Sequence, residues 1–157
     1  MPRRAPEILI EKTARRLRLI APGEPERLFP AVLGRNAGMD KSIEGDFATP
    51  LGEFTICARN PRSRFFLSLC LGYPNAAHAA RGLAAGLIDA AEYREVLAAL
   101  SAGRVPPQDT RLGGEIYIHG EVAQGRDWTH GCIALGNSAM LEVYDRVALG
   151  TRVLIVN

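Results

Sequence analysis

The chain has 157 residues, which is a usual length for one domain and excludes a second folded unit of ordinary size. With 47% apolar and 23% charged residues, its composition is that of a globular protein and excludes a disordered or fibrous chain. The 19 Lys and Arg residues against 17 Asp and Glu residues leave a net charge of +2, which is too small to indicate a nucleic-acid partner. We therefore expect one domain over residues 1–157 that folds around its own apolar core.

Short runs with an apolar residue near every second position dominate the first half of the chain and predict β-strands. Turn-forming residues at 22–25 separate two of these runs, as is typical of an antiparallel meander. Residues 34–52 are polar and rich in turn formers, so they predict a long surface loop. The predicted strands of this half cover 7–13, 15–21, 27–33, 54–59 and 65–71.

Alanine-rich segments in the middle of the chain predict helices over 76–85 and 89–102. Asp89 with Glu92 three residues later is typical of a capping box at the start of the second helix. The fold class is therefore mostly β (α+β), with a helical insertion over 74–112 that we expect to act either as a lid or as plain core packing. The rest of the chain predicts a strand, a helix and a last strand, over 115–120, 137–149 and 151–157.

The first apolar run, at 8–10, is far shorter than the apolar centre of a signal peptide, and no run approaches the length of a transmembrane helix. This pattern predicts a cytoplasmic protein without a membrane partner, or a periplasmic one if the chain is a trimmed fragment. Three cysteines are an odd number without paired spacing, which favours a reducing compartment over a disulfide scaffold.

The most informative stretch holds two of the three histidines, His119 and His130, on either side of Cys132. A cysteine nucleophile needs its thiolate, and an imidazole within hydrogen-bond reach promotes ionisation by accepting the proton. Gly131 leaves the backbone beside the thiol unencumbered, so the amides of Gly131 and Cys132 could face a developing oxyanion. The pattern indicates acyl transfer.

Two alternatives compete with that interpretation. Cys57 and Cys70 lie in apolar strand patterns and are expected to be buried small side chains without a role in the chemistry. A zinc site formed by His119, His130 and Cys132 is the other alternative, but Glu121 and Asp127 lack diagnostic spacing for a fourth ligand. We therefore expect no metal and no cofactor. The third histidine, His78, is expected to be a surface or packing residue.

Together these residues resemble the L,D-transpeptidase catalytic domain family, also called the YkuD domain. The resemblance spans most of the chain. It comprises the His-Gly strand end, the Thr-His-Gly-Cys motif with an apolar residue and a later Asn, and an upstream Thr-Pro-x-Gly-x-Phe turn. The matching positions are Leu33-Gly34, Thr49-Pro50-Leu51-Gly52-Glu53-Phe54, His119-Gly120, Thr129-His130-Gly131-Cys132, Ile133 and Asn137.

The resemblance implies a β-sandwich or open barrel with the helical insertion and one helix after the catalytic cysteine. It implies that Cys132 attacks the L,D bond of a peptidoglycan stem peptide, with His119 as base and acid. Gly131 and Cys132 would supply the oxyanion hole, and His130 would shape the catalytic loop. The substrate-binding residues that we expect are Thr129, Gly120, Asn137, Tyr73 and Arg126.

Two departures from the family pattern bear on substrate binding. The loop between His119 and His130 is shorter than in many members, and Ala134 stands where many members have an arginine. Arginine is the side chain that usually binds a carboxylate, through two parallel hydrogen bonds. Its absence leaves Arg35, Arg126 and Lys41 as candidates for that role.

We expect a cytoplasmic L,D-carboxypeptidase that trims tetrapeptide stems during muropeptide recycling, with stem peptides or muropeptides as partners. The alternative in the same family is an L,D-transpeptidase that forms peptidoglycan crosslinks. A third alternative, of another class, is a noncatalytic domain that binds peptidoglycan peptides.

Overall fold

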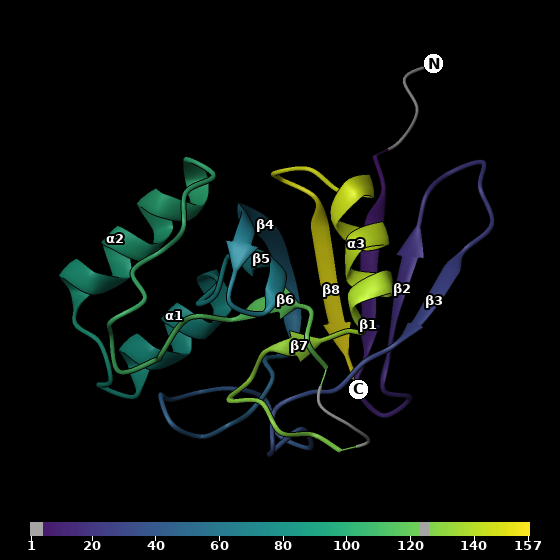
Figure 1. Ribbon diagram of the computed structural model, residues 1–157. Coiled ribbons are helices and arrows are strands. Elements are labelled where there is room, and N and C mark those ends of the chain that lie inside the picture. The colour runs from purple at the N-terminus through teal and green to yellow at the C-terminus, as the bar shows by residue number, and fades with distance from the viewer. Residues whose placement is uncertain (1–4, 123–125) are drawn as a thin grey trace.

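A computed structural model describes residues 5–122 and 126–157. Eight strands form one sheet in the order β3-β2-β1-β8-β4-β5-β6-β7, and three helices lie outside it (Figure 1). The fold is mostly β, as expected from the sequence. The elements are β1 Glu7–Glu11, β2 Arg16–Ile20, β3 Arg27–Pro30, β4 Gly52–Ser63, β5 Phe66–Leu71, α1 Ala76–Ala84, α2 Ala90–Ser101, β6 Tyr117–His119, β7 Ile133–Ala134, α3 Asn137–Arg146 and β8 Arg152–Val156.

The first three strands form the predicted antiparallel meander. Their alternation places one set of side chains in the core, as shown by the fully buried Ile8 and Ile10 of β1. The C-terminal strand β8 then enters between β1 and β4, running parallel to β1 with Ile8 opposite Val153. Helix α3 completes this main core with the buried side chains of Met140 and Val143.

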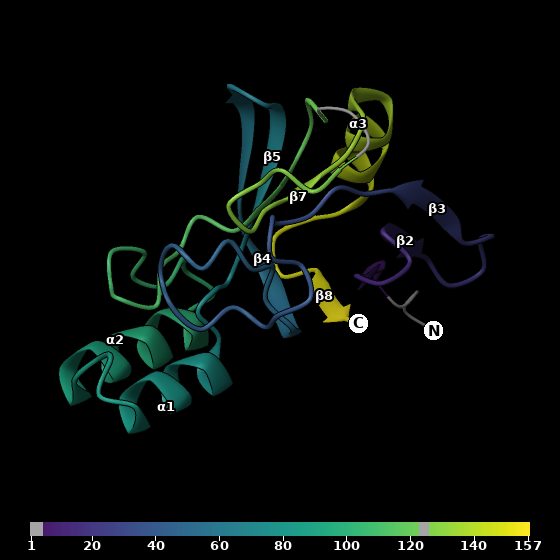
Figure 2. The same ribbon diagram turned by 90° about the horizontal axis from the view of Figure 1, so that it is seen from below.

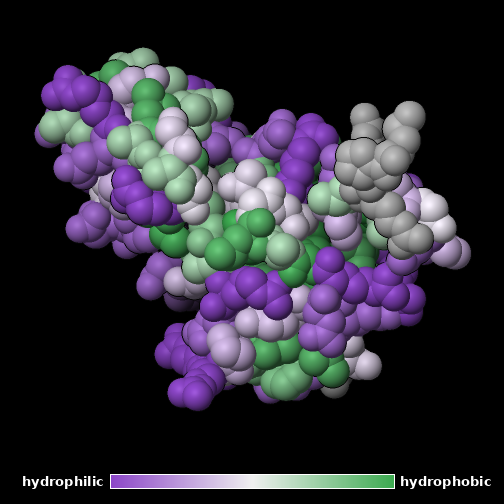
Figure 3. Space-filling view, turned by 90° about the horizontal axis from the view of Figure 1, so that it is seen from above, coloured by the Kyte–Doolittle hydropathy of each residue, from purple (hydrophilic) through white to green (hydrophobic). Residues whose placement is uncertain are grey.

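Helices α1 and α2 lie beside the sheet on the side opposite α3 (Figures 1 and 2). Both begin and end within two residues of the predicted positions, and the Asp89–Glu92 capping box is present. The two helices share an apolar cluster of their own, built around Ala79, Val96 and Leu112. We call α1 and α2, with the apolar cluster that they share, the helical lobe. Figure 3 shows it at the left of the molecule, with polar and apolar residues mixed over its surface.

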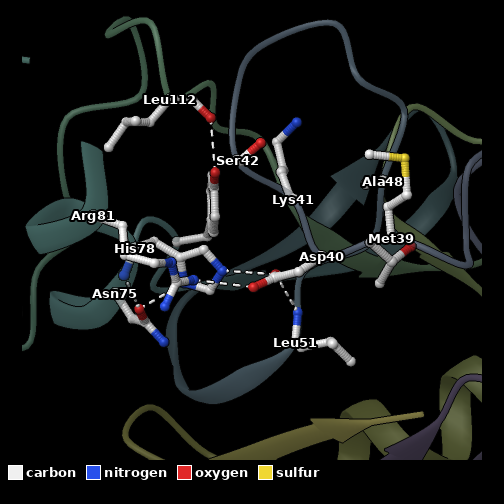
Figure 4. A network of polar contacts seen from close by, with 12 residues as sticks. Met39, Asp40, Lys41, Ser42, Ala48, Leu51, Asn75, His78, Arg81 and Leu112 are labelled. Carbon is white, nitrogen blue, oxygen red and sulfur yellow. Dashed lines mark hydrogen bonds and ion pairs between the residues drawn. The ribbon is translucent and has the colours of Figure 1, made fainter. Parts of the chain in front are cut away.

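Two polar anchors hold the long loop 34–52 against the rest of the molecule. On one side, the buried Lys12 Nζ donates to Met39 O at 2.7 Å and to Thr49 O at 2.6 Å, which ties two points of the loop together. On the other side, Asp40 accepts from the Leu51 N–H at 2.8 Å and contacts His78 of α1 (Figure 4). The loop 34–52, which the sequence predicts to lie on the surface, is therefore fixed on both sides.

His78 is the centre of the second anchor. Its ring nitrogens lie 2.7 Å from Asn75 Oδ1 and 2.9 Å from Asp40 Oδ1, and its side chain is 3% exposed. Arg81 reaches the other Asp40 oxygen at 3.0 Å from a largely exposed side chain. Burial lowers the pKa of His78, so the folded chain favours the neutral imidazole. Of the two roles expected for this residue, the structure shows packing.

We expect His78→Ala to destabilise the fold by about 2–3 kcal/mol, because it leaves Asp40 and Asn75 without their partner and opens a cavity. Arg81→Ala is the control, since this exposed ion pair should contribute less than about 1 kcal/mol. Urea unfolding of both variants measures the difference. Equal losses of stability in the two variants would contradict the anchor role.

Stability of the wild-type protein should also fall as the pH drops below 6.5, the ordinary histidine value, because the unfolded chain then binds the proton more readily.

Candidate active site

Cys132 lies directly before β7, in a cleft of about 870 Å³ that His119 also lines. Its Sγ donates to Glu115 O at 3.2 Å and accepts from the Tyr117 N–H at 3.4 Å. Burial raises the pKa of the Cys132 thiol to about 11, so the resting sulfur is protonated at neutral pH. To act as a nucleophile, this thiol would therefore need a base to take its proton.

His119 is the last residue of β6 and is 2% exposed. Its Nδ1 lies 2.7 Å from Gly120 O. Because a carbonyl oxygen only accepts, Nδ1 carries the ring proton and Nε2 keeps its lone pair. Burial lowers the pKa of His119, so the imidazole is neutral near pH 7 and suited to act as a base.

Two aromatic rings hold the His119 imidazole in place. Phe65, from the turn between β4 and β5, stacks on it with 4.5 Å between ring centroids. Trp128 lies edge-on at 6.0 Å, and its buried indole N–H has no acceptor within the described part of the chain. A linear sequence pattern identifies neither ring, because nothing in it brings residue 65 to residue 119.

Internal hydrogen bonds shape the loop that carries Cys132. Thr129 Oγ1 donates to Cys132 O at 2.7 Å and accepts from the Gly131 N–H at 3.1 Å. Gly131 has φ +135°, and a Cβ there would lie 2.7 Å from Ala48 O, so this position requires glycine. The Gly131 amide is occupied by Thr129, which corrects the expectation that it supplies the oxyanion hole together with the Cys132 amide.

The predicted substrate-binding residues do not lie together in the structure. Thr129 lines the cleft, but its hydroxyl is used within the loop, and Gly120 acts through the carbonyl that holds His119. Tyr73 was expected at the substrate, but its ring is fully buried and its hydroxyl donates to Leu112 O at 2.8 Å. It packs under the helical lobe, which corrects that expectation.

Asn137 and Arg126 do not line the cleft either. Asn137 Oδ1 accepts from the Glu121 N–H at 2.7 Å, so the amide positions the chain after β6. Arg126 is exposed. His130 does line the cleft, from an exposed position with its ring 4.9 Å from Phe47.

Of the candidates for binding a carboxylate, Lys41 alone lines the cleft. Its Nζ is already paired with Asp46 Oδ1 at 3.0 Å. Arg35 Nε donates to Trp128 O at 3.3 Å from outside the cleft lining.

Gln108, which follows α2, connects the helical lobe to the surroundings of Cys132. Its Nε2 donates to Tyr73 O and to Pro106 O, both at 2.8 Å, and its Oε1 accepts from the Glu115 N–H at 2.7 Å. Glu115 has φ +57°, and its carbonyl accepts from the Cys132 thiol. Gln108 therefore helps to hold the carbonyl that orients the sulfur.

We expect Gln108→Ala to lower kcat by about 10-fold, with little change in KM, because it frees the Glu115 carbonyl to move away from the thiol. Gln108→Glu keeps an acceptor for the Glu115 N–H, so it should retain more of the rate. Steady-state kinetics with a stem tetrapeptide, together with the rate of thiol alkylation in the folded protein, measure both effects. Equal activity in the alanine variant and the wild type would contradict this positioning role.

Residues 5–122 and 126–157 contain no group of three or more His, Cys, Asp or Glu side chains placed to hold a metal ion. The zinc alternative therefore finds no ligand set in this part of the chain. None of the helices in the same residues combines the length and the apolar character needed to cross a bilayer.

Solved structures with the same fold cover almost all of this chain. The helical cell shape determining protein Pgp2 from Campylobacter jejuni, as its K307A mutant, aligns with a TM-score of 0.64 and 20% identity over 98% of this chain and 47% of its own. Bd1075 from Bdellovibrio bacteriovorus aligns with a TM-score of 0.61 and 21% identity over 98% of this chain and 48% of its own. An L,D-transpeptidase from Mycobacterium smegmatis aligns with a TM-score of 0.57 and 18% identity, over 97% and 59%.

The chain thus spans about half the length of the first two of these proteins. No curated protein matches its sequence. The family model for the L,D-transpeptidase catalytic domain, YkuD, matches residues 5–155. That match covers the sheet except the last residue of β8, together with Cys132 and His119, and the chain belongs to the L,D-transpeptidase catalytic domain family.

Proposed function

We propose that this chain is a cysteine-dependent enzyme that cleaves the L,D bond between diaminopimelate and the terminal D-Ala of peptidoglycan tetrapeptide stems. One observation carries the proposal. Cys132 and His119 line one cleft, and the hydrogen bond from His119 Nδ1 to Gly120 O leaves Nε2 as the basic nitrogen. This arrangement suits acyl transfer through a thioester.

In the proposed first step, the thiol proton of Cys132 moves to His119 Nε2 as the sulfur attacks the carbonyl carbon of the L,D bond. The C–N bond of the tetrahedral intermediate then breaks, and the amine of D-Ala takes the proton from His119. Water attacks the thioester in the second step, with His119 again acting as base. The products are the tripeptide and the free thiol.

We favour water as the acceptor and therefore an L,D-carboxypeptidase that acts on soluble stem peptides in muropeptide recycling. An amine of a second stem as acceptor would make the protein an L,D-transpeptidase, with the same Cys132 chemistry. In the decisive experiment, the protein is incubated with a defined tetrapeptide, with and without an amine acceptor, and the masses of the products are measured. Tripeptide alone supports hydrolysis, and a ligated product supports transfer. A protein that binds the peptide without releasing D-Ala would instead be the noncatalytic domain.

The cytoplasmic location expected from the sequence is part of this proposal. Cell fractionation with an antibody against the chain tests it. Recovery in the periplasmic fraction would favour the transpeptidase, because assembled peptidoglycan lies outside the cytoplasmic membrane.

The helical insertion stays a predicted lid, and the segment that follows α2 supports this role. Val105, Gln108 and Gly113 from this segment line the cleft, whereas the helices themselves do not. Leu112 of this segment packs on both helices. We expect replacement of residues 76–101 by a short Gly/Ser linker to release the segment from the cleft and to raise the ratio of transfer to hydrolysis, because a bulky acceptor could then approach the thioester. Product masses measure the ratio, and circular dichroism checks the fold. An unfolded protein or an unchanged ratio would contradict the lid.

A further inference from the structure

The turn between β4 and β5 is joined to the proposed catalytic base. Phe65 O accepts from the Gly120 N–H at 3.0 Å, and the Phe65 ring stacks on His119 with an interplanar angle of 25°. Within the turn, the Phe65 N–H donates to Ser63 Oγ at 3.0 Å. The residue next to Phe65 in this turn is Arg64, so the backbone of Arg64 is held beside the base. The labelled strands β4 and β5 can be followed toward this turn in Figure 2.

The Arg64 side chain lies over the same aromatic ring. Its Cζ is 5.0 Å from the Phe65 ring centroid, and the Phe65 and His119 centroids are 4.5 Å apart. The Arg64 Cζ therefore lies no farther from the His119 ring centroid than the sum of these two distances. Arg64 is exposed, it lines the cleft, and no acceptor for it lies among residues 5–122 and 126–157.

The other charged residues that line the cleft cannot take its place. Lys41 is 3% exposed and donates to Asp46 Oδ1 at 3.0 Å and to Ile43 O at 3.2 Å, so its charge is already balanced. Glu44 and Glu115 are acidic and repel an anion. Within the described residues, Arg64 is the lining Lys or Arg side chain whose charge has no acidic partner.

We propose that Arg64 binds a carboxylate of the stem peptide and so sets the specificity of this cleft for acidic peptides. The proposal rests on the proposed function. The side chain at position 134, where many family members have an arginine, is a fully buried alanine of β7, so no cation acts from there. A guanidinium resting on Phe65 keeps its N–H groups directed to the side, where a carboxylate accepts two of them.

Two carboxylates of the tetrapeptide could be the ligand: the C-terminal carboxylate of D-Ala, and the carboxylate at the far end of the diaminopimelate side chain. Each can be removed chemically by amidation. A peptide that lacks the carboxylate bound by Arg64 should bind the wild-type protein and the Arg64 variant with equal affinity. The amidated peptides therefore identify which of the two groups is recognised.

The test measures dissociation constants by calorimetry in the Cys132→Ala background, so that binding is read without turnover. Arg64→Met keeps an apolar side chain on Phe65 and removes the charge; we expect it to weaken binding of the unmodified tetrapeptide by about 10- to 100-fold. Arg64→Lys should recover part of this loss. Arg62→Met is the matched control, since Arg62 is an exposed arginine of the same hairpin that does not line the cleft.

Unchanged affinity in Arg64→Met, or a loss equal to that in Arg62→Met, would overturn the proposal. An equal loss on amidation in the wild type and in Arg64→Met would overturn it as well, because the carboxylate would then be bound elsewhere. Failure of the proposed function is seen separately, as no release of D-Ala by the protein with Cys132 intact. In turnover assays, Arg64→Met should raise KM more than it lowers kcat, and this separates a binding role from loss of structure.

Discussion

Cys132→Ala is expected to abolish the release of D-Ala from a tetrapeptide, lowering the rate by about four orders of magnitude or more, because no other group in the mechanism forms the thioester. The fold should persist, since the change removes one sulfur from a half-buried position at the cleft. Mass spectrometry of the protein during turnover provides a second readout. The wild type should carry an acyl group on Cys132, and the variant should carry none.

The matched controls are Cys57→Ala and Cys70→Ala. Both thiols are buried, at 9% and 5% exposure, as expected from their strand patterns. Burial raises the pKa of Cys70 to about 12, so this thiol is protonated and unreactive although it also lines the cleft. Each control should lose about 1 kcal/mol of stability and keep its activity per folded molecule. Near wild-type cleavage by Cys132→Ala would refute the proposed mechanism.

The second large effect is expected at His119. His119→Ala should slow acylation by about 10²- to 10⁴-fold, because the protonated thiol of Cys132 then has no base. His130→Ala should slow it by no more than about 10-fold, since His130 is exposed and packs on Phe47 at the cleft wall. Pre-steady-state measurement of D-Ala release compares the two variants. A larger loss in His130→Ala would reverse the assignment of the two histidines.

The pH dependence provides an independent check on His119. Burial lowers its pKa, so the wild-type acylation rate should fall only below pH 6.5, the ordinary histidine value, as the imidazole becomes protonated. In His119→Ala the rate should instead rise toward alkaline pH, following ionisation of the Cys132 thiol, whose pKa burial raises to about 11. Identical profiles for the two proteins would mean that His119 is not the base.

Local patterns in the sequence predicted most of the secondary structure. The Asp89–Glu92 capping box and the antiparallel meander form as expected, because the capping and alternation that produce them act between residues close in the chain. Several boundaries differ, among them the end of β3, at Pro30 instead of 33. Strand β4 extends to Ser63, beyond the predicted end at 59, since pairing with β5 and its bulges continues the strand. Helix α3 ends at Arg146, before the predicted 149.

Short-range motifs also predicted the nucleophile and the base that we propose, because the Thr-His-Gly-Cys loop and the His-Gly strand end place chemically distinctive groups at fixed offsets. The motif did not specify the partner that orients the His119 ring, which is the Gly120 carbonyl. Tyr73 and Asn137 could not be placed in the same way. Whether an aromatic ring or an amide faces the cleft or packs beneath a neighbouring segment depends on contacts that a linear pattern does not contain.

By itself, then, the sequence predicted most of the elements, the family and the Cys132–His119 pair of the proposed mechanism. Tertiary structure alone decided the environment of that pair. Pairing of β5 with β6 brings the turn at Phe65 onto His119, and the chain after α2 brings Gln108 to the carbonyl that orients Cys132. The contact between Phe65 and His119 joins residues far apart in the chain, whereas Gln108 and Glu115 are seven residues apart. Both contacts form because burying strands and helices together places their ends side by side. The same burial shifts the pKa values of Cys132 and His119, which no residue type specifies in isolation.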